Sequence, residues 1–325
     1  MPNVRSDAAV GDFLADLNRL IGPVSPDVIL GIAFSGGPDS LALLLLAHAA
    51  LPGQIRAATV DHQLRRESAD ESAHCASVCA SLGIAHDILT PAQAITGSVQ
   101  AAARSVRYAL LHTWADEQGI VHILTAHHAD DQAETMMMRL NRGSGIAGLA
   151  GIRAVNGRVV RPVLTWRRER LASIVAASGC TALSDPSNRD DRFDRARIRK
   201  ALASANWIDA AAMASTAATL ADAEVALVWA TEQAAEKHLQ TGDQSCTIVA
   251  PGSLPTEIRR RLVGRALTTL DPACLSSGPE TMRLMASLLA GGKASIGALI
   301  GENRGGDWHF TKAPPRSPRN AVNSA

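Results

Sequence analysis

The chain has 325 residues, a formal net charge of +1 and five cysteines. Its length allows two domains with a sizeable core in the first. The lack of a signal-like N-terminal segment, and of an apolar stretch long enough to cross a bilayer, argues against a secreted or membrane protein. The odd cysteine count without a Cys-x-x-Cys pair argues against a disulfide framework, so we expect free thiols and a cytoplasmic location.

Charge is distributed unevenly along the chain. Residues 1–152 carry 9 Lys and Arg against 15 Asp and Glu, whereas residues 153–200 carry 12 against 5. Residues 201–325 carry 11 of each sign. A basic block beside an acidic first half is typical of a protein that binds a polyanion. A solvated charged face is the alternative explanation.

The first predicted elements are a helix, a strand and a second helix. Residues 12–21 place apolar side chains at helical spacing, and the apolar run 28–34 is typical of a buried parallel strand. An alanine- and leucine-rich helix follows at 41–51. The six residues between this strand and this helix, 35–40, read Ser-Gly-Gly-Pro-Asp-Ser. The glycines allow a tight turn and proline suits the first helical position, so backbone N–H groups at the helix start are expected to face an anion.

This loop is not a Walker A loop, because it contains no lysine. It contains a carboxylate, Asp39, which would repel phosphate unless a divalent cation lay between them, so we expect Mg²⁺ on Asp39. The loop resembles the PP-loop, SGGxDS, of the N-type ATP pyrophosphatases, which cleave ATP to AMP and pyrophosphate. The resemblance implies that ATP is bound by Ser35, Gly36, Gly37, Pro38, Asp39 and Ser40. An ordinary strand-to-helix turn is the alternative.

Strands and helices then alternate. Strands are predicted at 55–60, 85–89 and 121–126, and helices at 67–82 and 99–118. This alternation specifies an α/β fold with a doubly wound parallel sheet, of the PP-loop ATPase type. Asp61 and His62 follow the second strand, and ligands bind at the carboxyl ends of parallel strands, so we expect both to face the nucleotide. A surface turn is the alternative. Arg104 and Arg107 lie one turn apart on one face of the long helix.

The fourth strand is followed by His-His-Ala-Asp-Asp-Gln-Ala-Glu-Thr, residues 127–135. Asp130 and Asp131 suit the start of a helix, but this cluster of acidic and histidine side chains exceeds what capping needs. Asp131 and Glu134 are three residues apart and point the same way, which suits Mg²⁺ or an ammonium group. Zinc on the two histidines would need a third ligand, and none stands at zinc spacing.

Two later segments carry positive charge. Arg142 and Gly143 open a glycine-rich stretch that is predicted to bend sharply near a ligand, although a flexible linker would look the same. An edge strand at 159–164 and a helix at 167–178 follow. A basic helical segment comes next, and its four arginines are expected to bind RNA phosphate. They are Arg192, Arg195, Arg197 and Arg199. Salt bridges with neighbouring aspartates are the alternative.

The last third of the chain is predicted to be mainly helical, with helices at 206–238, 256–270 and 281–290. A short strand-like run lies at 246–249, and residues 301–312 are glycine-rich and polar. We therefore expect a first α/β domain at 1–205, a smaller α-helical accessory domain at 206–312, and a disordered tail at 313–325.

Four segments together resemble the tRNA(Ile)-lysidine synthetase family: 35–40, 127–135, 142–151 and 185–199. The segment 127–135 is the most specific of them, because other PP-loop groups lack it. The resemblance covers about the first two hundred residues. Gln63, Ser184 and Ala196 depart from the family pattern, which has glycine, an acidic residue and asparagine there.

The resemblance implies an ATP-dependent ligase. It would adenylate carbon 2 of the wobble cytidine in an isoleucine tRNA with a CAU anticodon, and the ε-amine of free L-lysine would then displace AMP. Catalysis is assigned to Asp39, Asp130, Asp131 and Glu134. Beyond the loop, ATP binding is assigned to Asp61, His62, Arg104 and His127, and substrate binding to Arg107, Arg142, Gly143, Arg192, Arg195, Arg197 and Arg199. The resemblance also implies that residues 1–205 form the catalytic domain and that the helical domain at 206–312 binds tRNA. A homodimer is a candidate assembly.

Two other functions remain open from the sequence. A PP-loop tRNA thiolase would carry sulfur on paired cysteines, and Cys75 and Cys79 stand in a Cys-x-x-x-Cys pattern on a helix. A non-catalytic ATP-dependent RNA-binding module would not need the carboxylate cluster. Pyrophosphate release in the presence of tRNA would separate this module from either enzyme.

Overall fold

The computed structural model describes residues 8–64, 67–92, 99–183, 194–205, 207–274 and 276–313. The chain forms two compact units that divide between Asp222 and Ala223, within helix α9 (Ala210–His238). The domain boundary predicted between residues 205 and 206 precedes this helix and stays a proposal. The predicted tail lies, from residue 314 onward, outside the described residues.

Six strands form the sheet of the first unit, in the order β3-β2-β1-β4-β6-β5. They are β1 (Leu30–Ala33), β2 (Ile55–Val60), β3 (Ala85–Leu89), β4 (Ile123–Leu124), β5 (Val155–Asn156) and β6 (Val159–Val160). All neighbours pair in parallel except β5, which pairs antiparallel with β6. The predicted doubly wound α/β sheet is confirmed, but the strand predicted at 159–164 is not the edge, because β5 covers it.

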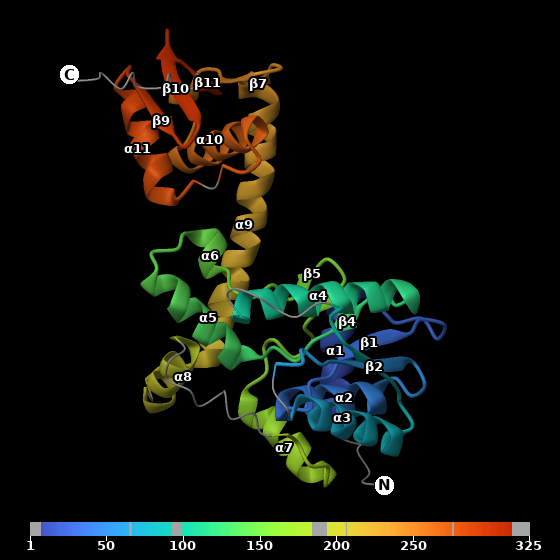
Figure 1. Ribbon diagram of the computed structural model, residues 1–325. Coiled ribbons are helices and arrows are strands. Elements are labelled where there is room, and N and C mark those ends of the chain that lie inside the picture. The colour runs from blue at the N-terminus through green and yellow to red at the C-terminus, as the bar shows by residue number, and fades with distance from the viewer. Residues whose placement is uncertain are drawn as a thin grey trace, which may run out of the picture. The chain divides into compact units, whose positions relative to one another are not determined.

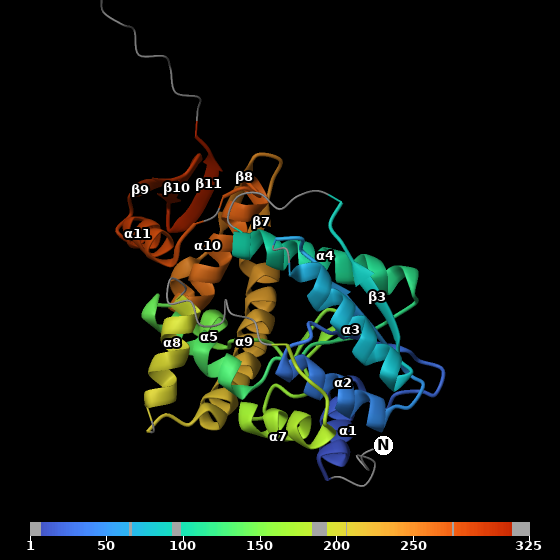
Figure 2. The same ribbon diagram turned by 60° about the horizontal axis from the view of Figure 1, so that its bottom comes forward.

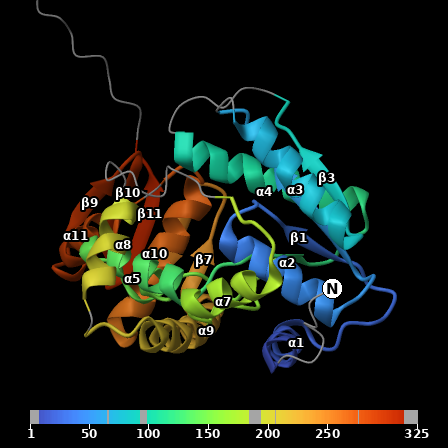
Figure 3. The same cartoon turned by 90° about the horizontal axis from the view of Figure 1, so that it is seen from below.

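Helices pack on both faces of this sheet (Figure 1). They include α1 (Ala8–Ile21), α2 (Pro38–Ala50), α3 (Ser68–Leu82), α4 (Val99–Glu117) and α7 (Arg168–Ser178). Figure 1 shows α4 on one side of the strands and α2 and α3 on the other. Figures 2 and 3 show α1 and α7 beside α2, which both contact. Leu111 and Trp114 of α4 form the core of one face, and α1, α2, α3 and α7 form that of the other.

The most deeply buried element is α2. Every residue from Ser40 to Ala47 is buried, as is typical of a helix that is apolar on all sides. Phe13 of α1 and Leu171 of α7 pack into the same core. Burying one leucine side chain contributes about 1.5–3 kcal/mol, so this leucine-rich helix holds the loop at its start in a fixed position.

β1 and β4 are neighbours in the sheet, although the chain forms β2 and β3 between them. This is the topological switch point of a doubly wound sheet, where such folds bind ligands. The loop 35–40 leaves the carboxyl end of β1, and residues 125–128 leave that of β4. The two most specific motifs in the sequence therefore meet at one edge.

The second unit contains a five-stranded antiparallel sheet in the order β7-β8-β11-β10-β9. Its elements are β7 (Leu239–Thr241), β8 (Ser245–Ile248), a 3-10 turn (Pro251–Ser253), α10 (Thr256–Leu270), α11 (Gly278–Leu289), β9 (Lys293–Ile296), β10 (Leu299–Arg304) and β11 (Asp307–Lys312). α10 and α11 pack on each other and on the sheet, around buried Trp308 and Phe310.

The helices predicted for this unit are confirmed, and a sheet that the sequence did not predict accompanies them. Residues 301–312, noted only as glycine-rich and polar, belong to β10 and β11. Buried residues alternate along both strands, but Gly301 occupies one buried position. A Cβ on Gly301 would lie 3.0 Å from the Phe310 ring, so glycine is needed here for packing. Because glycine has no apolar side chain, the alternation of apolar and polar residues along β10 cannot be recognised in the sequence.

Helix α9 has the length and apolar composition of a membrane span, with a mean hydropathy of 1.3 over its best window. No such stretch was expected from the sequence, and α9 corrects that expectation. Length and composition are weak evidence for a span. Within the second unit, Glu224 and Glu232 of this helix pair with Arg261 and Arg265 of α10.

Candidate active site

The shape of the loop 35–40 depends on Gly36. Its φ is +78°, and a Cβ there would lie 2.5 Å from Leu183 Cδ1 and 2.9 Å from Cys75 Sγ. Its carbonyl accepts a hydrogen bond from the Leu183 N–H at 2.9 Å. A side chain at this position would therefore displace the loop, and glycine is required.

Two serines close the loop internally. Ser40 Oγ donates to the Gly37 carbonyl at 3.0 Å, and it accepts from the Ser35 N–H at 3.2 Å. Pro38 occupies the first turn of α2, directly after the N-cap Gly37, and Asp39 follows. The start of a buried helix is thus presented as an anion site that includes one carboxylate.

A cavity of about 820 Å³ opens at the switch point, large enough for a nucleotide. The predicted site residues that line it are Ser35, Gly37, Pro38, Asp39, Ser40, Arg107, His127, Asp131, Arg195 and Arg199. Predicted residues that do not line it are Gly36, Asp61, His62, Arg104, Asp130, Glu134, Arg142, Gly143 and Arg197. Arg192 lies outside the described residues.

The acidic wall of the cavity is organised around His128, which is 3% exposed. Its Nε2 lies 3.5 Å from Asp39 Oδ2 and 3.6 Å from Asp131 Oδ2, and its Nδ1 lies 3.5 Å from Asp130 Oδ2. Burial alone would lower the pKa of His128, but Asp130, Asp39 and Asp131 raise it to about 10. His128 is therefore an imidazolium that holds three carboxylates together.

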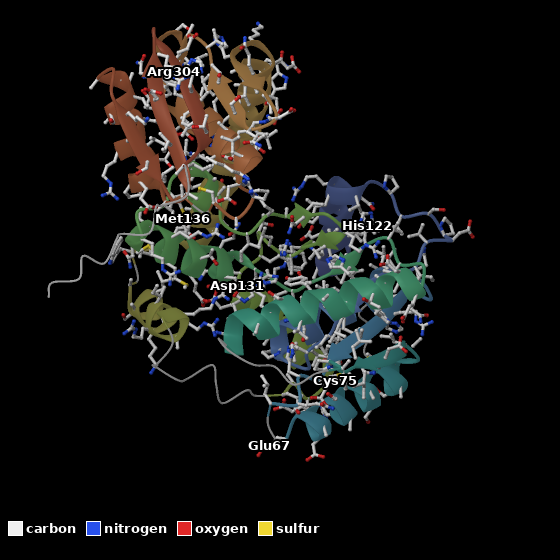
Figure 4. The ribbon with its side chains drawn as sticks, turned by 45° about the horizontal axis from the view of Figure 1, so that its top comes forward. Glu67, Cys75, His122, Asp131, Met136 and Arg304 are labelled. Carbon is white, nitrogen blue, oxygen red and sulfur yellow. The ribbon has the colours of Figure 1, made fainter. Side chains whose placement is uncertain are left out.

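The two aspartates at the start of α5 (Ala129–Asn141) differ in environment. Burial would raise the pKa of Asp130, yet His128, the Arg168 backbone N–H and Arg167 lower it. Asp131 accepts from the His128 N–H at 3.1 Å, but its burial dominates and raises its pKa. Figure 4 labels Asp131 near the start of α5. Asp131 is thus the carboxylate on the cavity wall that binds a proton more readily than usual.

Glu134, one turn further along α5, is 2% exposed and is bound by two arginines of α8 (Asp194–Ser204). Arg199 Nε lies 2.5 Å from Glu134 Oε1, and Arg195 Nε lies 3.1 Å from Glu134 Oε2. Arg195 also donates to Thr135 Oγ1 at 3.3 Å. Two arginines that the sequence assigned to tRNA therefore join α8 to α5, whereas Arg197 is exposed.

The opposite wall is basic. His127 lines it, and its Nδ1 lies 3.3 Å from Arg161 Nε. Burial lowers the pKa of His127 to about 2, together with the charges of nearby arginines. These are Arg161, Arg107, Arg104 and Arg195. Arg104 stacks over the Tyr108 ring at 5.2 Å.

Asp61 and His62 follow β2, but neither lines the cavity, so their expected contact with the nucleotide stays a prediction. Asp61 is buried and accepts from the Gln63 N–H at 2.8 Å. Gln63 has a φ of +54°, a conformation that glycine adopts more easily. Burial and the charge of Arg107 lower the pKa of His62.

The glycine-rich stretch after α5 contains the short helix α6 (Ile146–Leu149) and is fixed by two side chains of α5. Gln132 donates to the Ile152 carbonyl at 2.7 Å and accepts from the Ile152 N–H at 2.6 Å. Arg139 donates to the Gly151 carbonyl at 3.0 Å. Arg142 and Gly143 are exposed at its start, so this stretch is a braced loop rather than a free linker.

No group of three or more His, Cys, Asp and Glu side chains within the described ranges could hold a metal ion by itself. Mg²⁺ seldom needs such a group, because it binds through one or two carboxylates together with substrate phosphates. Asp39, a partly exposed carboxylate beside the anion site, fits this mode.

The cysteines do not fit sulfur transfer. Cys75 and Cys79 are fully buried free thiols on α3, where Figure 4 labels Cys75. Burial raises the pKa of both, to about 12 for Cys79, whereas a sulfur carrier needs an accessible thiolate. Cys75 instead packs below Gly36 of the loop.

Several residues of the site were not assigned from the sequence. His128 and Arg161 orient the two walls, and Arg168 and Glu71 line the cavity. The histidine doublet was the signal for His128, but only the fold shows which histidine faces carboxylates. Arg161 gave no signal, because nothing in the sequence places residue 161 beside residue 127.

Comparisons with known proteins agree with this geometry. A family model described as a PP-loop domain matches residues 11–206. The chain is 41% identical over 313 residues to a tRNA(Ile)-lysidine synthase of Novosphingobium aromaticivorans, covering 94% of each chain. It is 42% identical over 297 residues to the enzyme of that name from Zymomonas mobilis, covering 88% of this chain and 89% of the relative.

Among solved structures, a U34-tRNA thiolase from Methanococcus maripaludis matches with a TM-score of 0.50 and 15% identity. The match covers 59% of this chain and 71% of that one. At this identity the likeness supports the PP-loop fold alone.

Proposed function

Because this chain belongs to the tRNA(Ile)-lysidine synthase family, we propose that the cavity between β1 and β4 adenylates a tRNA cytidine and then attaches lysine to it. The protein is an ATP-using ligase that modifies tRNA(Ile) with lysine. In the first step, O2 of the wobble cytidine attacks the α-phosphorus of ATP and pyrophosphate leaves. In the second, the ε-amine of lysine attacks carbon 2, AMP leaves and the amine loses a proton.

The observation that carries this proposal is the anion site at the start of α2, next to one carboxylate. Loop residues Ser35 to Ser40 would hold the ATP phosphates, and Asp39 would hold Mg²⁺ beside them. The ion neutralises charge on the phosphates when it is bound. His128 supports this role, because its Nε2 lies 3.5 Å from Asp39 Oδ2 and holds that carboxylate at the cavity wall.

The basic wall would hold the rest of the nucleotide. Arg107 and His127 line the cavity opposite the loop, and Arg104 adds positive charge behind them. Asp61 and His62 would fix the end of β2 next to Arg107. Guanidinium groups suit phosphate oxygens by charge and geometry.

Lysine would bind at the acidic wall. A second cavity of about 580 Å³ is lined by Asp130, Glu134 and Arg199, together with aliphatic side chains such as Leu202 and Ile208. Carboxylates, arginines and an aliphatic wall together suit a zwitterionic amino acid with a long stem. Both cavities are lined by Arg168 of α7 and Arg199 of α8, so they adjoin at these two side chains.

We assign the proton transfer to Asp131. A lysine amine has a pKa of about 10.4 and must lose a proton to attack. Asp131 lines the first cavity, and its raised pKa brings it closer to the range of a useful general base. Asp130 is held ionised by its partners, and Glu134 is already bound by two arginines, so we assign them to binding and to anchoring α8.

The tRNA would lie on the surface beside these cavities. Arg197, Arg142 and Gly143 are exposed, and Arg192 stands in the same basic segment of the sequence. Arg195 and Arg199 would contribute to this surface while they bind Glu134. The bases of an anticodon loop can be unstacked and inserted into a protein site, as single-stranded RNA usually is.

The thiolase and the non-catalytic module are not favoured. The buried cysteines oppose the first, and the relatives oppose both. We propose further that the enzyme works in the cytoplasm without a membrane, since its tRNA and lysine substrates are found there. A homodimer stays a prediction, which sedimentation of the purified protein would test.

The function is tested with ATP, Mg²⁺, lysine and an isoleucine tRNA with a CAU anticodon. The modified nucleoside should gain the mass of one lysine less one water, and AMP should form in equal amount. Omitting lysine should leave adenylated tRNA or no net product. Incorporation that required a sulfur donor, or no AMP with any tRNA, would contradict the proposal.

A further inference from the structure

Arg161 follows β6 and is 4% exposed. Its Nη1 donates to the Arg153 carbonyl at 2.7 Å, its Nη2 lies 3.5 Å from the Tyr108 hydroxyl, and its Nε donates to His127 Nδ1 at 3.3 Å. No carboxylate in the described part of the chain forms an ion pair with it. A buried charge without a counter-ion costs stability, which argues for a role beyond packing.

The bond to His127 decides where that imidazole carries its proton. An arginine N–H can only donate, so Nδ1 of His127 must be the acceptor. Thr125 Oγ1 lies 3.1 Å from the same nitrogen and can donate to it as well. A neutral imidazole has one protonated nitrogen, and that nitrogen is then Nε2. Protonating Nδ1 would place two donors against each other, next to the positive charge of Arg161.

We propose that Arg161 is a positioning residue that locks His127 as a neutral imidazole protonated on Nε2, so that His127 donates a hydrogen bond to an acceptor oxygen in the cavity. Nδ1 already accepts hydrogen bonds from Arg161 and Thr125. The Nε2–H group is therefore the one polar group of the ring that can still bind a ligand in the cavity. The loop 35–40 lines the same cavity, so the acceptor is a phosphate oxygen of the nucleotide. This step rests on the proposed function, whereas the tautomer does not.

The charged groups around His127 all act in one direction. Burial opposes a positive charge on the ring most strongly. Four arginines oppose it as well: Arg161 after β6, Arg104 and Arg107 of α4, and Arg195 of α8. A locked neutral donor cannot take a proton from the lysine amine through Nε2. His128 cannot do so either, because it already carries its proton. Neither histidine of the doublet is then the base, which agrees with the assignment of the proton transfer to Asp131.

The test is the nitrogen-15 NMR spectrum of the full-length protein labelled in its ten histidines. The His127 signals are assigned from their loss in His127→Gln. We expect an unprotonated Nδ1 and a protonated Nε2, with no titration between about pH 5 and 8, where an ordinary histidine changes charge. A protonated Nδ1, or titration near the ordinary value, would overturn the proposal. Neither ATP nor tRNA is needed, so this result is independent of the enzyme's reaction.

Arg161→Met removes the donor, and Arg158→Met is the matched control. Arg158 is a nearby arginine that binds Asp116 and the His112 carbonyl instead. In Arg161→Met the ring should populate both tautomers, so that Nδ1 becomes partly protonated, whereas Arg158→Met should leave the tautomer unchanged. The His127 pKa should rise in Arg161→Met but stay below its ordinary value, because the ring remains buried among the other arginines. An unchanged ring in Arg161→Met would assign the lock to Thr125 and contradict the role of Arg161. If Arg161→Met does not fold, Arg161→Lys tests the same role, because it loses the Nε donor but keeps the charge. Its His127 ring should also populate both tautomers.

Two amide substitutions test the use of Nε2–H. Glutamine places an amide N–H near the position of Nε2, and asparagine places one near Nδ1. His127→Gln should keep pyrophosphate release within about 10-fold, and His127→Asn should lose roughly 100-fold, the size of one lost donor to developing charge. Equal losses, or the reverse order, would remove the donor role even if the tautomer is as expected.

Discussion

His127 and His128 are adjacent in the chain, but their rings lie among groups of opposite charge and differ in charge themselves. His127 lines the cavity, whereas His128 is not among its lining residues. His128 lies among Asp39, Asp130 and Asp131, which raise its pKa to about 10. His127 lies among arginines in a buried position, which lowers its pKa to about 2. One residue type at one strand end thus supplies a fixed cation and a fixed neutral donor, because backbone alternation turns the two rings toward different neighbours.

The comparison divides the reaction between the two walls. The basic wall and the loop would hold the nucleotide, whose charge is negative, and the acidic wall would hold the amine, whose charge is positive until it loses a proton. Asp39 lies where the two meet, since it belongs to the loop and contacts His128. A substitution in one wall should therefore affect the step or substrate assigned to that wall more than the step or substrate assigned to the other.

Asp39→Asn should have the largest effect, because it removes the carboxylate next to the phosphates. Pyrophosphate release should fall by roughly 10³-fold or more, the size found for charge-stabilising groups in phosphoryl transfer. Asp70→Asn, an exposed aspartate of α3, is the control. Near-normal release by the Asp39 variant, measured with tRNA and saturating ATP, would remove Asp39 from the mechanism.

Glu134→Gln should weaken the fold of the acidic wall. The change leaves Arg195 and Arg199 without their carboxylate, and both are partly exposed. The loss should be roughly 2 kcal/mol of unfolding free energy, less than for a fully buried pair. Urea unfolding measures it, with the exposed Glu169→Gln as control. Equal stability of both variants would mean that the arginines do not hold α8 to α5.

The stability of the two walls should depend on pH in opposite ways. The pKa of His128 is raised above its unfolded value, so its contribution is complete below about pH 6.5 and is lost as the pH rises toward about 10. The pKa of His127 is lowered, so it disfavours folding only below about pH 6.5, where the unfolded ring is protonated.

Urea unfolding from about pH 6.5 to 10 should therefore show a decline of the order of a few kcal/mol in the wild type. His128→Gln should lack this part of the decline. The same slope in both proteins would contradict the imidazolium assignment.

Arg197→Gln should have the smallest effect and should be measured on tRNA binding. The slope of log affinity against log salt should fall by about one unit, as for one lost phosphate contact. Arg195→Gln should change the slope less, because its guanidinium is bound to Glu134. Fluorescence anisotropy of labelled tRNA over a salt series measures both. Equal slopes for wild type and Arg197→Gln would leave that side chain as a solvated charge.

Much of the first unit could be predicted because its signals are local. The loop 35–40 combines the end of a strand, two glycines and a helix start in one short stretch, and the parallel doubly wound sheet follows from the alternation of strands with helices. The partners of Glu134 could not be predicted in this way. A row of arginines at helical spacing has the same appearance in sequence whether it faces RNA or a buried carboxylate 61 residues away.

The sheet of the second unit was missed for a similar reason. Gly301 interrupts the apolar alternation of β10, and the aromatic ring that fills the space belongs to β11. Likewise, the doublet of histidines indicated a site but not its charges, which depend on Asp39 at the start of α2 and on Arg161 after β6. Tertiary neighbours, rather than residue type, set these features.

The division of labour between the walls is tested most directly by separating the two half-reactions in Asp131→Asn. The tRNA is incubated with ATP labelled in its α-phosphate, and adenylated tRNA, AMP and lysine-bearing tRNA are followed with and without lysine. Adenylation should stay close to that of the wild type, and lysine transfer should fall about 10²- to 10⁴-fold, so that adenylated tRNA accumulates. Equal loss of both steps, as expected for Asp39→Asn, would contradict the assignment of Asp131 to the amine.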